Sequence, residues 1–532
     1  MIVGIDFGTC FSSVAIMNGL IPVTTCVKDT TGVGIPTLFM YSKSQNKELY
    51  GEECLTGEAF RHEEDIIRNM KRIVRENFDN MDKTVVSGGR EYSVKEVIEK
   101  FLAYLISEVK KGAVKSGEFK NTEIEEITIT APVGIAQGQM MATDYNRFIQ
   151  EAVMRITNLG KEHVRILQEP VSAAISYLYG EDVRQHYDKE QKIMVFDLGG
   201  GTLDVTIMKH DPRAMTYEIL AKDGDLNLGG NDWDQALAEA VMKKTGVREF
   251  HSEDEKAAFT RSVTKLKIDL TNSSDSMIFF TQNGEDKFTR FSRREFEDAT
   301  KHLMDRSIGV INSTLESFNE GLTGIDKIVL VGGSCNMPQI REGIVRAFRN
   351  FDEDSILIYE PSKAIAKGAA VFSKINSSAG KSGRGPKVID STTVTYGFES
   401  FYNGERSRIY NMIFRDTPFD ETGVIRARSE ESFIPMRDDQ TNVAFDIYES
   451  KSRRGDGPEG EWADFGNGEV QNGLHVTVQV PPEYLGRARG FCMWVELTLD
   501  TNGILEITIL DRAGKKLGFA SSSMGYDYEA GE

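Results

Sequence analysis

Two short stretches of this 532-residue sequence place carboxylates beside glycine-rich turns. The first, "IVGIDFGTCFSSVAIM", carries Asp6 before a Gly-Thr turn, and the second, "IMVFDLGGGTLDVTIM", carries Asp197 before three glycines and a threonine. Apolar alternation resumes directly after each turn, which predicts a β-hairpin with a glycine tip. Such a tip lets backbone N–H groups surround an anion, because no Cβ stands in the way.

An aspartate at the start of each turn would be repelled by bare phosphate, so the pattern indicates an intervening cation. Mg²⁺ takes oxygen ligands, keeps several waters and bridges phosphates. We therefore expect a cation such as Mg²⁺ between Asp6, Asp197 and the phosphates of a nucleotide, which would lie in a cleft between two related subdomains. A third glycine turn, "LVGGSCNMP" at 330–338, is expected near the nucleoside. Asp204 has two open interpretations: a further polar ligand, or the first outward residue of the returning strand.

The rest of the chain supplies elements that would position these residues. Residues 1–378 alternate helix-like and strand-like segments, which predicts an α/β domain. Small and polar residues dominate 379–390, as in a linker. Residues 391–520 are rich in β-branched and aromatic residues in alternation, which predicts an all-β sandwich. We expect 450–468 to be a mobile loop and 521–532 a disordered tail.

Composition excludes several classes of function. The net charge of −19 argues against nucleic-acid partners and anionic membranes, because both would repel most of the surface. No apolar run reaches the roughly 18 residues of a spanning helix, and the N-terminus has no basic region of a secretory signal, so a cytoplasmic protein is expected. The five cysteines form no C-x-x-C pair, and no H-E-x-x-H occurs, so neither zinc nor a disulfide framework is indicated.

The ordered set of motifs resembles the actin-like ATPase superfamily and, within it, the heat-shock 70-kDa chaperones of the DnaK type. The matching stretches, from Met1 to about Lys516, include "GIDFGTCFSSVAIM", "IIRNMKRIV", "VRILQEPVSAAISY", "VFDLGGGTLDVTIM", "DGDLNLGGNDWD", "LKIDLT", "VLVGGSCNMPQI" and "WVELTLDTNGILEITILDRAGKK". The resemblance implies a two-lobed actin-like α/β ATPase domain with duplicated subdomains, followed by a small β-sandwich. Filament proteins and sugar kinases share some of these motifs but lack the β-domain.

The resemblance implies an ATP site that uses ATP/ADP and Mg²⁺. Lys71 would position the attacking water, and Glu169 would lie near the metal and this water. Without the family, Lys71 is more simply a solvated residue of a basic helix, and Glu169 an exposed loop acid. The implied catalytic set is Lys71, Glu169, Asp197 and Thr202. The implied nucleotide-binding set is Asp6, Gly8, Thr9, Cys10, Gly199, Gly200, Gly201, Gly229, Gly230, Lys267, Thr271, Gly332, Gly333, Ser334 and Asn336.

Several positions depart from the family pattern, and four of them bear on the expected nucleotide affinity. Cys10 stands where a second threonine is usual, and Thr264 where a glutamate contacts the sugar. Asn336 replaces an arginine that stacks on adenine, and Ser362 replaces an aspartate. Because a stacked guanidinium contributes about 1 kcal/mol or more, we expect weaker or less adenine-selective binding.

The resemblance also implies coupling residues and a peptide site. Arg165 matches a docking point for J-domain co-chaperones, Asp390 a linker aspartate, and Pro132 a proline that transmits the nucleotide state; each has an ordinary structural alternative. The linker retains only two apolar residues, which predicts weak coupling. The candidates to line a peptide pocket, for which core packing is an equal alternative, are Phe398, Phe401, Val443 and Phe445.

Two functions remain open at this point. The first is an ATP-hydrolysing chaperone that binds unfolded or specific client polypeptides and works with a J-domain co-chaperone and a nucleotide exchange factor. The second is a nucleotide-gated adaptor with negligible turnover and one dedicated partner. The chain stops soon after its last expected strand, so we expect no helical lid and fast peptide release.

Overall fold

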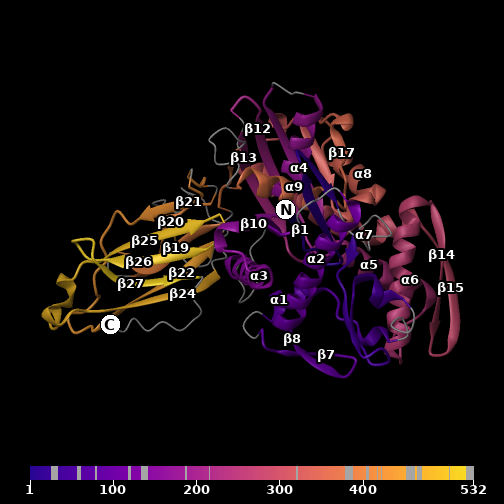
Figure 1. The fold of residues 1–532 in the computed structure, drawn as a ribbon, viewed down its shortest axis with the longest axis horizontal. Helices are drawn as coiled ribbons and strands as arrows, with labels where there is room; N and C mark the ends of the chain where they lie inside the picture. The colour runs from indigo at the N-terminus through magenta and orange to yellow at the C-terminus, as the bar shows by residue number, and fades with distance from the viewer. Residues whose placement is uncertain are drawn as a thin grey trace. The chain divides into compact units, whose positions relative to one another are not determined.

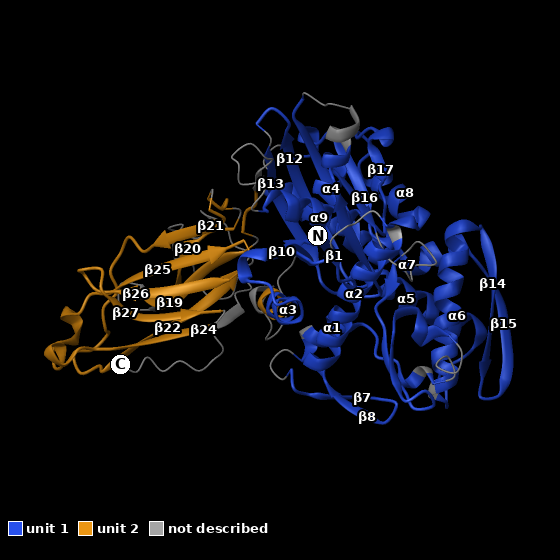
Figure 2. Cartoon of the chain, in the orientation of Figure 1, with its two compact units in different colours: residues 1–134, 150–387 blue, residues 135–149, 388–532 orange. Residues whose placement is uncertain are grey.

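The computed structural model in Figure 1 describes most of the chain. The described residues are 1–24, 34–56, 62–77, 81–117, 122–132, 142–185, 189–214, 216–318, 321–377, 387–392, 394–402, 406–415, 417–420, 422–450, 462–463, 470–501 and 504–522. Two compact units share the chain (Figure 2): Met1–Gly134 with Gln150–Lys387, and Ile135–Ile149 with Val388–Glu532. Most of the predicted linker, and the predicted tail except its first two residues, lie outside the described residues.

Unit 1 contains two sheets of the same topology. The first has the order β10-β9-β1-β2-β3, with β4 also paired to β2, and the second contains the order β17-β16-β11-β12-β13. In each, an antiparallel hairpin is followed on one side by two parallel strands. Both sheets therefore contain the predicted glycine-tipped hairpin, and their equal topology agrees with the expectation of two related subdomains. The strands are β1 (Ile2–Asp6), β2 (Phe11–Asn18), β3 (Ile21–Thr24), β4 (Ile35–Pro36), β9 (Glu126–Ala131), β10 (Val164–Gln168), β11 (Gln191–Leu198), β12 (Leu203–Asp211), β13 (Thr216–Asp225), β16 (Lys327–Val331) and β17 (Ile356–Ile358).

Two helices lie between these sheets. Helix α9 (Ala364–Ile375) packs on β1, β2 and β9, and α4 (Glu169–Gln185) packs on β11 and β12. The two helices also pack against each other, and Figure 1 shows them side by side at the centre of the unit. Glycines allow this close approach: a Cβ at Gly368 would lie 1.7 Å from the carbonyl oxygen of Ser172, and one at Gly4 would lie 2.2 Å from the amide of Ala370.

The remaining elements of unit 1 surround the two sheets. Helix α2 starts after Ser93, whose hydroxyl accepts from the amide of Glu96, and a short strand, β8, directly precedes it. These elements are β5 (Phe39–Ser42), β6 (Lys47–Tyr50), α1 (Met70–Glu76), β7 (Thr84–Ser87), β8 (Arg90–Ser93), α2 (Val94–Ser116), α5 (Gly230–Thr245), α6 (Glu253–Asn272), β14 (Asp275–Gln282), β15 (Glu285–Ser292), α7 (Arg293–Ser317) and α8 (Pro338–Ala347), while α3 (Ala142–Thr157) crosses the boundary between the units.

Unit 2 contains two antiparallel sheets around one apolar core, which agrees with the predicted sandwich. Their orders are β23-β20-β19-β22-β24 and β21-β25-β26-β27. Trp462–Ala463 form β23 and pair with β20, so the predicted loop at 450–468 contains a strand. The strands are β19 (Thr395–Tyr402), β20 (Arg406–Ile413), β21 (Val424–Arg428), β22 (Asn442–Ser450), β23 (Trp462–Ala463), β24 (Val470–Gln479), β25 (Trp494–Asp500), β26 (Leu505–Leu510) and β27 (Lys516–Ser521), and β18 (Lys387–Ile389) precedes them.

Among the helices that the structure describes, we find none with both the length and the apolar character needed to cross a membrane.

Candidate ATP site

The two hairpin tips face each other in unit 1. Asp6 ends β1, and Asp197 lies one residue before the end of β11. A Cβ at Gly200 would lie 2.5 Å from Sγ of Cys10, and one at Gly201 would lie 3.0 Å from Oγ1 of Thr9. The tips therefore approach so closely that a Cβ at Gly200 would collide with the Cys10 side chain, and one at Gly201 would crowd that of Thr9.

The other predicted glycine segments meet the second tip. The amide of Gly230 donates to the carbonyl of Gly199 at 2.9 Å, and the amide of Asn231 donates to that of Gly200 at 2.8 Å. From the third turn, the Ser334 hydroxyl also donates to the carbonyl of Gly199, at 2.9 Å. The structure thus brings together in one place the segments that sequence reasoning assigned to phosphates and nucleoside.

Lys71 and Glu169 form a buried ion pair beside these turns. Lys71 belongs to α1 and Glu169 begins α4, and their side chains are 5% and 7% exposed. The ammonium group of Lys71 donates to Oε1 of Glu169. The interpretations of Lys71 as a solvated helix residue and of Glu169 as an exposed loop acid are therefore wrong. Burying two charges is costly, and their pairing offsets part of that cost.

Two further carboxylates, those of Asp6 and Asp197, lie close to this pair. Burial, followed by repulsion from Glu169, raises the pKa of Asp6 to about 7, although Lys71 and the Thr130 hydroxyl oppose the shift. Burial raises the pKa of Asp197 well above its usual range, and the charges of Glu169 and Asp6 add to the shift. A cation bound at this point would reverse both shifts, because it would stabilise the ionised carboxylates.

The donor set fits a divalent cation. Oδ1 of Asp197 is buried and accepts no hydrogen bond from the residues that the structure describes. Buried carboxylate oxygens without partners are costly, and hard cations such as Mg²⁺ prefer oxygen ligands. Asp197 and the partly buried Asp6 on the facing tip therefore supply the oxygen donors that the predicted metal site requires.

Asp204 is not an outward-facing strand residue. It lies directly opposite Asp197 in the β11–β12 ladder and is fully buried. That position excludes the simpler of the two interpretations left open by the sequence. Asp204 belongs to the same buried group of acids as Asp197.

The small polar residues of the turns are largely buried. Thr9 and Thr202 are 9% and 6% exposed, and the carbonyl of Thr202 accepts from the amide of Gly199 at 3.0 Å. The thiol of Cys10 donates to Oδ1 of Asn231 at 3.4 Å. The amide of Gly8 donates to the Ser12 hydroxyl at 3.3 Å.

The residues predicted to bind the nucleoside form hydrogen bonds to other protein groups of the site. Lys267 Nζ donates to the carbonyl of Gly230 at 2.9 Å and to the Asp234 carboxylate at 2.8 Å. The Thr271 hydroxyl donates to the carbonyl of Lys267 at 3.0 Å. Nδ2 of Asn336 donates to the carbonyl of Gly333 at 3.0 Å, within its own turn.

Sequence reasoning did not select Asn69, Asn231 and Asp234, which also lie at this site. Asn231 donates from Nδ2 to Oδ1 of Asn69 at 3.2 Å and so connects α5 to the residue before α1. Asp234 accepts from Lys267 and is also hydrogen-bonded by Thr264. The stretch "GGNDWD" contained the signal, because its polar residues directly follow the two glycines that were chosen.

Comparison with known proteins identifies the family. The sequence profile described as "Hsp70 protein" matches residues 2–517, nearly the whole chain. The chain belongs to the Hsp70 family. The resemblance drawn from the motifs is thereby confirmed.

Two curated relatives show how far the Hsp70 likeness extends. The "Chaperone protein DnaK" of Mesomycoplasma hyopneumoniae (strain 232) is 31% identical over 381 residues, which are 70% of this chain and 58% of that protein. The "Chaperone protein HscA homolog" of Variovorax paradoxus (strain S110) is 28% identical over 527 residues, which are 95% of this chain and 75% of that protein. The match to DnaK therefore spans little more than half of that relative's length.

The predicted Hsp70 coupling residues lie in three different settings. Arg165 is 17% exposed; it pairs with Glu126 and donates to the carbonyl of Asn376 at 2.9 Å. Pro132 follows the end of β9. Asp390 is 8% exposed, and its carbonyl accepts from the amide of Phe419 at 2.8 Å. Arg165 thus connects β10 to the residue that follows α9, rather than extending freely into solvent.

The predicted peptide residues do not share one surface. Phe398 and Phe445 are buried in the core of unit 2, with ring centroids 5.5 Å apart, and Val443 packs beside this core. Phe401 is 42% exposed. Side chains three residues apart in a strand point to opposite faces, so Phe398 and Phe401 of β19 cannot line the same pocket. For Phe398 and Phe445 the structure favours the core-packing alternative.

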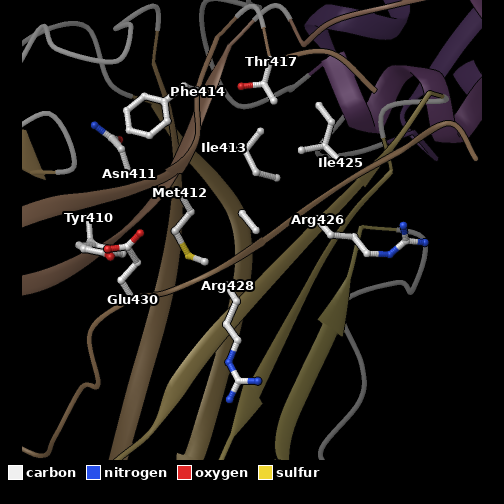
Figure 3. A pocket seen from close by; sticks show the side chains of 11 residues that line it. Tyr410, Asn411, Met412, Ile413, Phe414, Thr417, Ile425, Arg426, Arg428 and Glu430 are labelled. Atoms are coloured by element: carbon white, nitrogen blue, oxygen red, sulfur yellow. The ribbon is translucent and has the colours of Figure 1, made fainter. Parts of the chain in front are cut away.

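A cavity in unit 2 lies elsewhere (Figure 3). It is bounded by Tyr410–Phe414, by Ile425–Arg428 of β21, and by Thr417 and Glu430. None of the four predicted peptide residues lines it. Consecutive residues of both segments bound the cavity, so it runs along strand edges rather than over a sheet face.

Proposed function

We propose that this protein is an ATP-dependent chaperone of the Hsp70 type, in which ATP hydrolysis gates the binding of extended polypeptide segments by the β-domain. The buried Lys71–Glu169 pair beside Asp6 and Asp197, at the meeting point of the glycine turns, supports this proposal most strongly. Its combination of one cation with three carboxylates is suited to phosphoryl transfer, which depends on positioning and charge neutralisation.

In the proposed reaction a water oxygen forms a bond to the γ-phosphorus of ATP, and the bond from that phosphorus to the β–γ bridging oxygen breaks. ADP leaves with the bridging oxygen, and a proton is released to solvent. Lys71, held by Glu169, orients the water, while the backbone amides of the glycine turns and the Thr9 and Thr202 hydroxyls hold the phosphates. Mg²⁺, held through water by Asp6 and Asp197, would neutralise phosphate charge.

The proposed partners follow from the same assignment. Client polypeptides would bind unit 2, and Phe401 is the member of the predicted pocket whose exposure suits contact with them. A J-domain co-chaperone and a nucleotide exchange factor would accelerate the cycle. The actin-like two-lobed arrangement proposed for unit 1 is supported by its two sheets of equal topology.

The test is single-turnover hydrolysis of ATP by the full chain in Mg²⁺ and in EDTA. We expect Mg²⁺-dependent release of phosphate. Tight nucleotide binding without phosphate release would favour the second candidate, a nucleotide-gated adaptor. Two observations favour the adaptor: Cys10 offers a thiol where a hydroxyl donor is usual, and the amide group of Asn336 donates to a carbonyl of its own turn.

Nucleoside selectivity gives a separate prediction. Because Asn336 and Thr264 cannot supply the arginine stack and the sugar-binding carboxylate, we expect calorimetric titration to show an ADP-to-GDP affinity ratio reduced by about 10-fold relative to a stacked-arginine site. Asn336→Arg should raise ADP affinity more than GDP affinity. Strict adenine selectivity in the parent, unchanged in the variant, would contradict the prediction.

A further inference from the structure

A second lysine is buried in unit 1, on β13. Lys222 is 1% exposed, so its ammonium group lies in the protein interior. A buried ammonium group requires hydrogen-bond partners, because its desolvation is costly. Nζ of Lys222 donates to Oε1 of Gln168 at 2.6 Å. Gln168 ends β10 of the first sheet, so Lys222 connects the two sheets.

Strand register places Lys222 beside the buried acids. One row across the second sheet pairs Thr206 with Lys222, and the next row on the same face pairs Asp204 with both Asp197 and Gly224. Side chains two residues apart in a strand point to the same face. Lys222 is therefore a diagonal neighbour of Asp204, at a spacing of about 7 Å, on the face that carries Asp197.

Gln168, which accepts the hydrogen bond from Lys222, lies next to Glu169 in the chain. Gln168 directly precedes Glu169, whose carboxylate accepts from Lys71. A continuous path therefore runs from Lys222 through Gln168 to the Glu169–Lys71 pair. Displacement of Gln168 would move the start of α4 relative to β11 and so change the separation of Glu169 from Asp197.

When fully ionised, the side chains around this path carry a net charge of about −2, which one divalent cation would neutralise. Asp6, Asp197, Asp204 and Glu169 supply four carboxylates, and Lys71 and Lys222 supply two ammonium groups. When all are ionised, two negative charges remain within the group. Without Lys222 a third negative charge would remain, and the carboxylates would repel one another more strongly.

We propose that Lys222 is a positioning residue of the ATP site, which holds Gln168 and thereby sets the distance between Glu169 and the metal-binding aspartates. This inference rests on the proposed nucleotide site. Lys222 acts through its hydrogen bond to Gln168, the residue before Glu169. Its removal should affect the Mg²⁺-dependent part of binding more than the nucleoside part.

The experiment measures ADP binding by Lys222→Met as a function of Mg²⁺ concentration. We expect the Mg²⁺ concentration at half-maximal effect to rise about 10-fold, as for residues that orient metal ligands. ADP affinity at saturating Mg²⁺ should change by less than about 2-fold, because mass action fills a weakened metal site when Mg²⁺ is in excess. Single-turnover hydrolysis should fall in parallel with Mg²⁺ affinity.

Two further variants separate positioning from folding. Gln168→Leu should reproduce the Mg²⁺ shift, and the double variant should add nothing to it, because both changes break one path. Lys209→Met, on β12, removes a partly exposed lysine paired with Glu218 and should leave Mg²⁺ dependence unchanged. If Lys222→Met does not fold, Gln168→Leu alone decides the question.

The outcomes also separate this inference from the proposed activity. A parent that binds Mg²⁺–ADP but releases no phosphate would refute turnover, while the Mg²⁺ titrations would still decide the role of Lys222. Unchanged Mg²⁺ dependence in Lys222→Met or Gln168→Leu, or additive effects in the double variant, would overturn the positioning role. A parent that binds no nucleotide would overturn both.

Discussion

Replacement of Lys71 by alanine is expected to slow single-turnover ATP hydrolysis by about 100-fold or more, in line with the loss of a positioned catalytic group. The Lys71 side chain is 5% exposed and pairs with Glu169, so its removal takes a buried cation from the site. ADP binding should weaken far less, because the glycine turns and the aspartates remain. Rapid-quench measurements of phosphate release and calorimetry of ADP binding provide the two readouts.

Loss of Lys71 also leaves the Glu169 carboxylate buried without its cation. Removal of one partner of a buried ion pair lowers the free energy of unfolding by about 3–5 kcal/mol. The single variant therefore needs a second variant that is expected to remain folded. Lys71→Met with Glu169→Gln removes both charges and keeps the volume. Lys265→Ala, an exposed position on α6, is the matched control and should hydrolyse at the parental rate. Equal rates in the parent, Lys71→Ala and the double variant would contradict the catalytic assignment and favour the adaptor.

Gly368→Ala is expected to destabilise unit 1 by about 3 kcal/mol, because overpacking at a rigid contact forces the backbone to move. The added methyl group would lie 1.7 Å from the carbonyl oxygen of Ser172 on α4. The same place holds a hydrogen bond from the Ser172 hydroxyl to the carbonyl of Ile365, at 2.6 Å. Separation of α4 from α9 would break this bond and move the start of α4, where Glu169 lies.

Scanning calorimetry, with hydrogen exchange of peptides from α4 and α9, measures this effect. Gly309→Ala is the matched control, since Gly309 is also inside a helix, α7, and a Cβ there meets no atom within 4 Å. That variant should gain about 0.5–1 kcal/mol from helix propensity. Equal stability of the two alanine variants would show that α4 and α9 can separate without cost, contrary to the packing described here.

Local patterns were sufficient for the parts of the fold that depend on near neighbours. The two hairpins with glycine tips could be predicted because turn chemistry and strand alternation are properties of about 15 consecutive residues. The repetition of the motif also predicted two related subdomains, and the sheet orders agree. The aspartates before the tips, Asp6 and Asp197, indicated a cation for the same local reason.

Long-range contacts decided the rest. Lys71 and Glu169 are separated by 98 positions, so no periodicity could show that they form a buried pair. The family resemblance supplied their roles, whereas burial excluded the surface alternatives. In the same way, only the register of β11, β12 and β13 reveals that Asp204 and Lys222 share a face with Asp197.

The β-domain shows most clearly which features the sequence alone could not predict. Strand alternation predicted a sandwich. Because all four are apolar, the sequence could not distinguish core residues from pocket residues among Phe398, Phe401, Val443 and Phe445. The sequence by itself thus determined which segments form the two hairpins, and it predicted which turns would bind phosphate and which acids would hold a cation. Only the tertiary structure decided which side chains are buried, because burial depends on which faces of distant strands and helices meet.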